Sequence, residues 1–269
     1  MRNTVDDKGG AAMNILRSIV MAFSMFSRIP MPTVEWKKEN MQYMLAVFPL
    51  VGCILAGLLF CWHLLSNFLS ISSVLFAVGM TVIPILYTGG VHLDGFCDTV
   101  DALSSHGDIE KKRSILKDPH TGAFAVIFVC VYFLASFGLY SELIRNTESV
   151  LLICTIPVIS RTLSGIAGIC FPVYGEQGLL AAFNKSANKL PALIVLCVWF
   201  AACSAAMVII NLFCGIAMIA VSICCTVCIY RISSKQFGGM SGDLSGFFLQ
   251  YSELALLAVI IVFQKVGLL

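Results

Sequence analysis

The sequence predicts an all-α, polytopic integral membrane helical bundle of about seven spans, preceded by an amphipathic helix at the membrane interface. Of the 269 residues, 59% are hydrophobic and only 12% are charged, whereas a soluble domain usually carries about 25% charged residues. The charges are also bunched. No Asp, Glu, Lys or Arg lies between Glu39 and Asp94, or between Lys189 and Arg231. Uncharged apolar stretches of this length are typical of spanning helices.

The elements follow from the apolar runs, and residues 1–269 are predicted to form a single membrane domain. Residues 1–12 are predicted to be a disordered tail. Residues 13–28 are short for a span and contain Arg17 and Arg28, so they are predicted to lie at the interface. A bilayer core of about 30 Å is crossed by about 20 helical residues, and each later apolar run is close to that length. The run 191–230 is too long for one span and is divided near Asn211 to Gly215. The predicted spans are 42–65, 71–91, 122–141, 149–172, 191–210, 214–231 and 247–264.

Loop charges predict the orientation. Lys and Arg concentrate before the first span and in every second loop after it, while the alternate loops hold only Arg145. The positive-inside rule then places the N-terminus in the cytoplasm and the C-terminus outside. We therefore expect a multi-pass protein of the cytoplasmic (inner) membrane. The polar segments 92–121, 173–190 and 233–246 fall on the cytoplasmic side, where they can share one active site.

Composition also limits the partners. The lipid bilayer is one partner, and a net charge of +2 is too small to argue for binding to nucleic acid. Most of the twelve cysteines lie in apolar runs, so they do not indicate a disulfide framework.

The sharpest motif is the segment 92–101, HLDGFCDTVD. Its aspartates Asp94, Asp98 and Asp101 are spaced i, i+4, i+7 and so lie within about 60° of one helix face. Two carboxylates about 4 Å apart repel by ~4 kcal/mol at an effective dielectric near 20. All-oxygen ligands suit Mg²⁺ or Mn²⁺, so the cluster indicates a divalent metal site. Gly95 leaves room for a ligand to approach.

Two other interpretations of this segment stay open. The aspartates can form a solvated acidic helix face just outside the membrane. A zinc site built from His92, Cys97, His106 and His120 is conceivable, although its spacings match no usual zinc pattern.

Three further features surround the aspartates. Asp118, before Pro119, either caps the next helix or faces the aspartates as a ligand or base, with Lys117 on phosphate. The glycine-rich segment 238–246 either offers backbone amides to an anion or places Asp243 as a helix cap.

Arg161 lies near the middle of a predicted span, where an arginine costs about 2.5–3.5 kcal/mol. It therefore needs either an anionic ligand or a structural partner such as Glu253, which lies in the apolar run of the last span.

Together these motifs resemble the cobalamin synthase family, membrane-bound adenosylcobinamide-GDP ribazoletransferases. The resemblance covers nearly the whole chain in the family's order, although His120 often has another residue in its place and Ala125 is commonly glycine. Its pieces are FSMFSRIPMP (23–32), HLDGFCDTVDAL (92–103), KDPHTG (117–122), SRTLSG (160–165) and GGMSGDLSGFFLQYSE (238–253).

The resemblance implies a late step of vitamin B12 biosynthesis, the assembly of the nucleotide loop. A hydroxyl of α-ribazole, or of its 5′-phosphate, attacks the phosphorus on the cobinamide arm of adenosylcobinamide-GDP. GMP leaves, and adenosylcobalamin or its 5′-phosphate forms. The resemblance also implies Mg²⁺ as cofactor, and association into a homo-oligomer or with other enzymes of the pathway is open.

Site residues are carried over by motif position. Asp94, Asp98 and Asp101 are the implied metal ligands. Asp98, Asp101 and Asp118 are the implied catalytic residues, and the sequence does not choose whether Asp98 or Asp101 is the base. The implied substrate-binding residues are His92, Lys117, Arg161, Gly239, Gly242 and Asp243.

Two other functions are kept in view. A CDP-alcohol phosphotransferase also uses an aspartate-rich motif at a membrane surface, but here the Asp-Gly pair comes first and no Ala-Arg pair follows. A transporter requires polar residues along a path through the bilayer, and only Arg161 and Glu253 are expected to lie deep.

Overall fold

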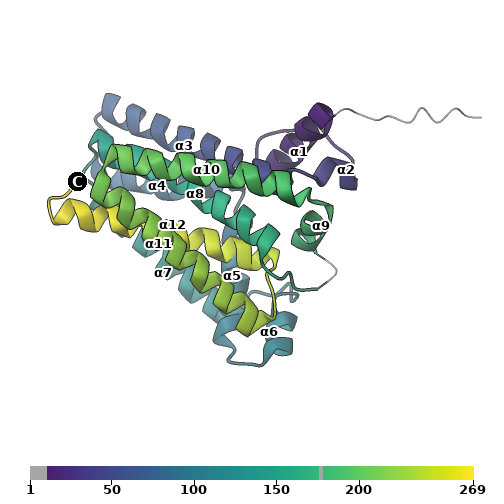
Figure 1. Ribbon diagram of the computed structural model, residues 1–269. Helices are drawn as coiled ribbons and strands as arrows, with labels where there is room; N and C mark the ends of the chain where they lie inside the picture. The colour runs from purple at the N-terminus through teal and green to yellow at the C-terminus, as the bar shows by residue number, and fades with distance from the viewer. Residues whose placement is uncertain (1–10, 176–177) are drawn as a thin grey trace, which may run out of the picture.

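The predicted helical membrane bundle is confirmed in the computed structural model, which describes residues 11–175 and 178–269 (Figure 1). Most of the predicted tail therefore lies outside the described residues. The first helix, α1, covers Ala11–Phe26 and starts earlier than the predicted 13–28. The long apolar helices match the seven predicted spans: α3 (Met44–Phe68), α4 (Ser73–Thr88), α7 (Ala123–Ser141), α8 (Thr147–Cys170), α10 (Lys189–Ile210), α11 (Leu212–Ile232) and α12 (Gly242–Lys265).

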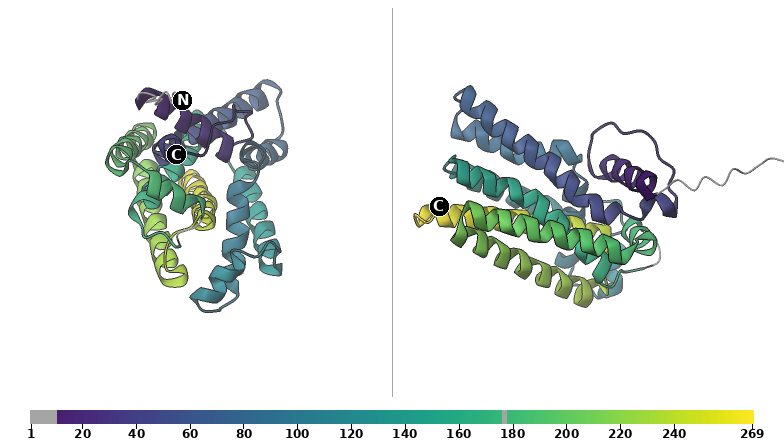
Figure 2. Two further views of the ribbon diagram at one scale, coloured as in Figure 1. Left: turned by 90° about the vertical axis from the view of Figure 1, so that its right-hand side faces the viewer. Right: turned by 45° about the horizontal axis from the view of Figure 1, so that its top comes forward.

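Six of these helices are long and apolar enough to cross a membrane, and a seventh span depends on α4. Helix α4 is followed at once by α5 (Val91–Ser104), which is bent from it by 95°. Seen along the bundle, the other long helices are viewed end-on while α5 runs across them (Figure 2). A seventh span is counted if α4, which has 16 residues, and α5 are taken together as one bent span.

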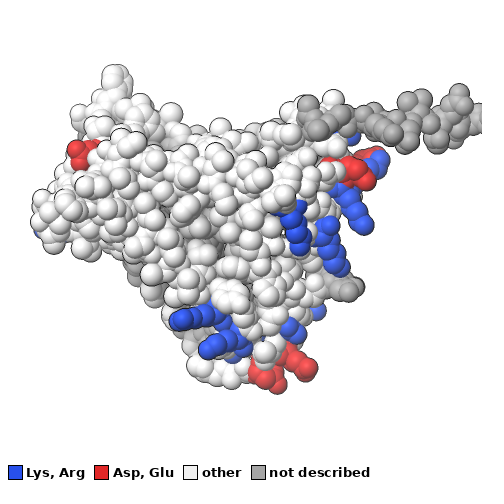
Figure 3. Space-filling model, in the orientation of Figure 1, with Lys and Arg blue, Asp and Glu red and all other residues white. Residues whose placement is uncertain are grey.

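The short helices gather at one end of the bundle. Helices α1, α2 (Lys38–Met41), α6 (Ile109–Ile115) and α9 (Leu179–Ser186) lie at the end opposite the C-terminus (Figure 1). On the visible face most Lys and Arg side chains also lie at this end (Figure 3). This end of the bundle therefore carries most of the visible positive charge, and α5 and the start of α12 lie close to it.

Side-chain caps explain several helix boundaries. The Asn211 side chain accepts a hydrogen bond from the Cys214 amide at 3.0 Å, so α11 begins with only Asn211 between it and the end of α10. The turn predicted near Asn211 to Gly215 is thus confirmed at Asn211. Gly215 belongs to the helix, where a Cβ would lie 2.5 Å from the carbonyl oxygen of Met207. Glycine lets α11 turn back closely against α10.

Helix α8 lies in the middle of the bundle and packs against α3, α10 and α12. At Gly52 a Cβ would lie 2.3 Å from the Pro157 carbonyl oxygen, so α3 and α8 approach with their backbones almost in contact. The core around them is apolar, with Leu55 and Ile153 almost fully buried. All twelve cysteines are free, as their places in apolar runs predicted.

Candidate active site at the junction of α5 and α12

Two glycines bring the aspartate helix against the last span. A Cβ on Gly95 of α5 would lie 2.8 Å from both Cα and the carbonyl oxygen of Asp243 on α12. A Cβ on Gly246 would lie 2.7 Å from the His92 carbonyl oxygen. Any larger residue at either position would push the helices apart. The contact places Asp243 beside the face of α5 that carries Asp94 and Asp98.

Asp94, Asp98 and Asp243, here called the carboxylate cluster, share one electrostatic environment. The pKa of Asp98 is raised to about 6, first by burial and then by the negative charges of Asp94, Asp243 and Asp101. No basic side chain contributes to this shift. Asp98 thus lies in a local concentration of negative charge.

Asp101 has a structural contact that the sequence did not predict. Its carboxylate oxygens accept hydrogen bonds from the backbone amides of Gly122, at 2.5 Å, and Ala125, at 3.1 Å. These amides belong to the start of α7, whose own N-cap residue, Gly122, has no side chain to offer. Asp101 therefore caps α7 from a different helix.

Two cavities meet beside the carboxylate cluster, at Asp243, while Asp98 lines neither of them. The larger, of about 660 Å³, is lined by Arg113, Lys117 and Tyr174 among others, and we call it the basic cavity. The smaller, of about 240 Å³, is lined by several aromatic rings, and we call it the aromatic cavity. Gly242 and Asp243 line both, and Asp94 lines the aromatic cavity. A molecule held across the junction would meet carboxylates at its centre.

The basic cavity is built by contacts between distant segments. The Arg113 guanidinium lies 3.8 Å from the centre of the Tyr174 ring, and its Nε donates to the Phe237 carbonyl at 2.8 Å. The Lys117 ammonium lies 5.9 Å from the same ring. Both cations are therefore held on one side of the cavity, as an anionic ligand requires.

The glycine-rich segment acts through close backbone packing. A Cβ on Gly239, whose φ is +151°, would lie 2.6 Å from the Tyr174 nitrogen. The Gly239 amide already donates to the Ser233 carbonyl at 2.9 Å, so it is not free to bind an anion. Of the two predicted substrate-binding glycines, only Gly242 lines the cavities.

The cap of α12 also differs from the prediction. Ser241 is the N-cap and accepts from the Leu244 amide at 3.2 Å. The interpretation of Asp243 as the cap was wrong. Helix α12 begins at Gly242, five residues before the predicted span start at 247, because the hydroxyl cap precedes the apolar run.

Asp118 lies apart from the carboxylate cluster. It is exposed and accepts from the backbone amide of His120 at 3.0 Å, with the His120 ring Nδ1 2.7 Å from the same oxygen. The backbone bond, then the ring bond, lowers the pKa of Asp118. Its interpretation as the cap of the next helix was wrong, since α7 begins at Ala123. The structure also does not bring it to the described cavities.

Arg161 is buried in a structural pair. It is 1% exposed, and its Nη1 donates to the Glu253 carboxylate at 2.8 Å and to the Pro157 carbonyl at 3.0 Å. Ser160 donates to the same Glu253 oxygen at 2.7 Å. Arg161 lines neither cavity. The structure thus shows the pairing with Glu253 that the sequence left open.

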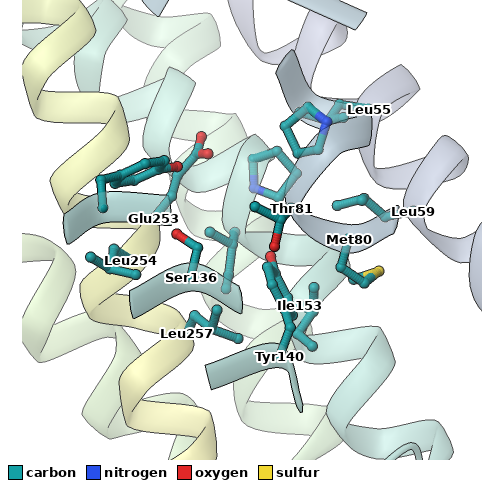
Figure 4. Close-up of a pocket in the computed structure, with 14 residues that line it drawn as sticks. Leu55, Leu59, Met80, Thr81, Ser136, Tyr140, Ile153, Glu253, Leu254 and Leu257 are labelled. Atoms are coloured by element: carbon teal, nitrogen blue, oxygen red, sulfur yellow. The ribbon is translucent and has the colours of Figure 1, made fainter. Parts of the chain in front are cut away.

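Glu253 also borders a small internal cavity of about 30 Å³ between the spans (Figure 4). Ser136, Thr81 and Tyr140 lie around it, among apolar side chains. Space of this size holds about one or two water molecules. We therefore regard it as part of the polar packing around the ion pair and not as a substrate site.

Within the described residues, no three His, Cys, Asp or Glu side chains lie close enough to enclose a metal ion. The conceivable zinc site from His92, Cys97, His106 and His120 is therefore not formed. The carboxylate cluster does fit Mg²⁺, which is commonly held by one or two carboxylates while substrate phosphates and water supply the other ligands.

Several lining residues were missed from the sequence. Arg113 was not separated from its basic neighbours Lys111 and Lys112, although it alone of the three lines the basic cavity. Phe26 lies in one of the motifs of the resemblance, but its place in a cavity wall, like that of Tyr174, was not predicted, because these walls meet only after distant segments pack.

Comparisons with known proteins identify the family of the chain. The profile of the cobalamin-5-phosphate synthase family matches residues 18–261. An adenosylcobinamide-GDP ribazoletransferase of Lachnoclostridium phytofermentans is 38% identical over 93% of this chain and 95% of its own length. Enzymes of that name from Clostridium botulinum strain Alaska E43 and Treponema denticola are 34% and 27% identical, each over 90% of this chain and over 95% and 96% of their own lengths.

No solved structure matches the chain. The family match covers the aspartate helix, the basic segment and the glycine-rich segment together, and the sequence resemblance is thereby confirmed. The chain belongs to the cobalamin-5-phosphate synthase family.

Proposed function

We propose that this chain is an adenosylcobinamide-GDP ribazoletransferase that makes cobalamin from adenosylcobinamide-GDP and α-ribazole or its 5′-phosphate. Its family membership supports the reaction. The structural observation that carries the proposal is the carboxylate cluster beside which the basic and aromatic cavities meet. A transfer between two large substrates needs two binding spaces that share one reactive point.

The reaction is a displacement at phosphorus. The acceptor hydroxyl forms a new O–P bond to the phosphorus attached to the cobinamide arm, and the P–O bond to GMP breaks. The hydroxyl proton passes to a carboxylate. We assign that role to Asp98, because both oxygens of Asp101 already accept backbone hydrogen bonds.

We propose that Mg²⁺ is the cofactor and that Asp94 and Asp243 hold it. When bound, it neutralises phosphate charge and stabilises the leaving GMP. Arg113 and Lys117 extend the positive potential over the adjoining basic cavity, so we place the donor's phosphates on that side.

We further propose that the site faces the cytoplasm and that the chain resides in the cytoplasmic (inner) membrane. The support is the concentration of Lys and Arg at the end that carries the site (Figure 3). This orientation gives the enzyme access to soluble nucleotides.

The direct test uses purified protein in lipid nanodiscs with adenosylcobinamide-GDP, α-ribazole or its 5′-phosphate, and Mg²⁺. GMP and the corrinoid product are separated by chromatography. We expect both products in equal amounts, and none after chelation. If folded protein releases no GMP with either acceptor, the proposed reaction is wrong, and CDP-linked lipid donors would be assayed next.

A further inference from the structure

The aromatic cavity carries a more specific inference about the acceptor. It lies among α1, α3, α5, α8, α9 and α12, and most of its lining is apolar. The polar lining residues are His92, Asp94, Ser164, Asp243 and Ser245. Pockets for whole small molecules usually measure about 300–1,000 Å³. A cavity of about 240 Å³ is suited to one apolar ring system of a larger substrate.

Its walls are aromatic rings from three different helices. The ring of Phe26 on α1 lies 4.5 Å from that of Phe48 on α3 and 6.5 Å from that of Phe183 on α9. Phe48 and Phe183 are buried, at 4% and 3% exposure. Rings arranged this way offer both faces and edges to a planar guest.

His92 supplies a polar atom with no partner. Its side chain lines the cavity and is 5% exposed, and its ring stacks on Phe26 with the centroids 5.8 Å apart. The Nε2 atom is buried and makes no hydrogen bond within the described residues. Buried polar atoms are nearly always paired, so this nitrogen indicates a ligand that brings the missing partner.

We propose that the aromatic cavity binds the heteroaromatic base of the acceptor nucleoside, with the His92 Nε2 hydrogen-bonded to a ring nitrogen of that base. The inference rests on the proposed function, whose acceptor is α-ribazole. Its base, dimethylbenzimidazole, is an apolar two-ring system with one unsubstituted ring nitrogen. With the base in this cavity, the sugar lies toward Asp94 and Asp243, and its hydroxyl faces the basic cavity across them.

The test measures the Michaelis constant (KM) of each of the two substrates separately. Phe183→Ala removes one wall, so we expect KM for α-ribazole to rise about tenfold or more while KM for adenosylcobinamide-GDP changes less than twofold. Phe171→Ala is the matched control, because Phe171 packs on Tyr230, 5.0 Å away, and lines neither cavity. We expect neither constant to change in that variant.

A second arm varies the acceptor. In the wild type, an α-nucleoside of unsubstituted benzimidazole should have a KM about tenfold higher, since two buried methyl groups are lost. In Phe183→Ala the ratio of the KM for the benzimidazole nucleoside to the KM for α-ribazole should fall to about threefold or less, because the methyl groups no longer contact the Phe183 ring. A general loss of structure would leave the ratio unchanged. Should Phe183→Ala fail to fold, Phe183→Leu is used, with smaller changes in the same direction.

The outcomes are distinct. If the donor's KM rises as much as the acceptor's, or if the methyl penalty is the same in both proteins, the base does not sit in this cavity. Unchanged constants throughout would mean that lipid or packing fills the cavity, which also overturns the inference. A wild-type protein that transfers nothing to any acceptor would instead refute the proposed function.

Discussion

At the residue scale, the structure separates the three aspartates of α5 by role. Asp101 accepts two amide hydrogen bonds from the start of α7, whereas Asp98 has its pKa raised by burial and by neighbouring carboxylates. Sequence spacing placed all three on one helix face correctly. It did not predict that one of them caps a different helix, because that contact depends on where α7 returns.

Asp101→Asn is therefore expected to lower the stability of the protein more than its kcat. The amide can accept only through its single oxygen, so one of the two cap bonds is lost at a cost of about 0.5–2 kcal/mol. We expect a lower thermal midpoint in nanodiscs and a kcat within about tenfold of the wild type. A loss of more than a hundredfold in kcat with unchanged stability would show that Asp101, not Asp98, is the base.

The pair between Arg161 and Glu253 is a second residue-scale test. The Arg161 side chain is 2% exposed and that of Glu253 is 16% exposed. Removing one partner strands a buried charge, which costs about 3–5 kcal/mol. We expect Arg161→Met to destabilise the protein strongly, and the double variant with Glu253→Leu to recover much of that loss. If both proteins are equally unstable, the ion pair does not account for the cost of replacing Arg161, and another partner of Arg161 must be sought.

At the element scale, the site depends on how closely α5 approaches α12. A Cβ on Gly95 would lie 2.8 Å from the Asp243 backbone, so Gly95→Ala is expected to separate the helices and cost about 1–3 kcal/mol. Activity should fall further than stability, because Asp243 moves away from Asp94. Thermal midpoint and kcat are measured on the same nanodisc sample.

Gly138→Ala is the control for that substitution. Gly138 lies within α7, and a Cβ there would meet no atom within 4 Å. We expect its stability and kcat to match the wild type. Equal loss in both variants would mean that the effect comes from glycine replacement in general and not from the contact between α5 and α12.

The elements themselves could largely be predicted from the sequence. Uncharged runs identified α3, α7, α8, α10 and α11 to within a few residues, because lipid imposes length and composition on each span separately. The start of α12 and the 95° turn before α5 depend on local caps and packing. The aromatic and basic cavities are each lined by residues from three or more helices, so no single segment revealed them.

At the scale of the whole molecule, most Lys and Arg on the face seen in Figure 3 lie at one end of the bundle, whereas Arg145 and Lys265 belong to the end that carries the C-terminus. The end with most Lys and Arg holds α1, α6, α9 and the candidate site, and the C-terminus lies at the other end (Figure 1). The positive-inside rule then predicts that the site faces the cytoplasm. A reporter fused after Leu269 tests this: alkaline phosphatase should be active there and green fluorescent protein dark. Fluorescence without phosphatase activity would reverse the orientation.

The most direct test of the account is the kcat of Asp94→Asn, Asp98→Asn and Asp243→Asn, measured as GMP release from adenosylcobinamide-GDP with α-ribazole. Asp108→Asn serves as the control, because Asp108 is an exposed cap of α6 that asparagine replaces equally well. We predict that each cluster variant folds and loses at least about a hundredfold in kcat, while the control stays within twofold. Near-wild-type turnover in all three cluster variants would contradict the site.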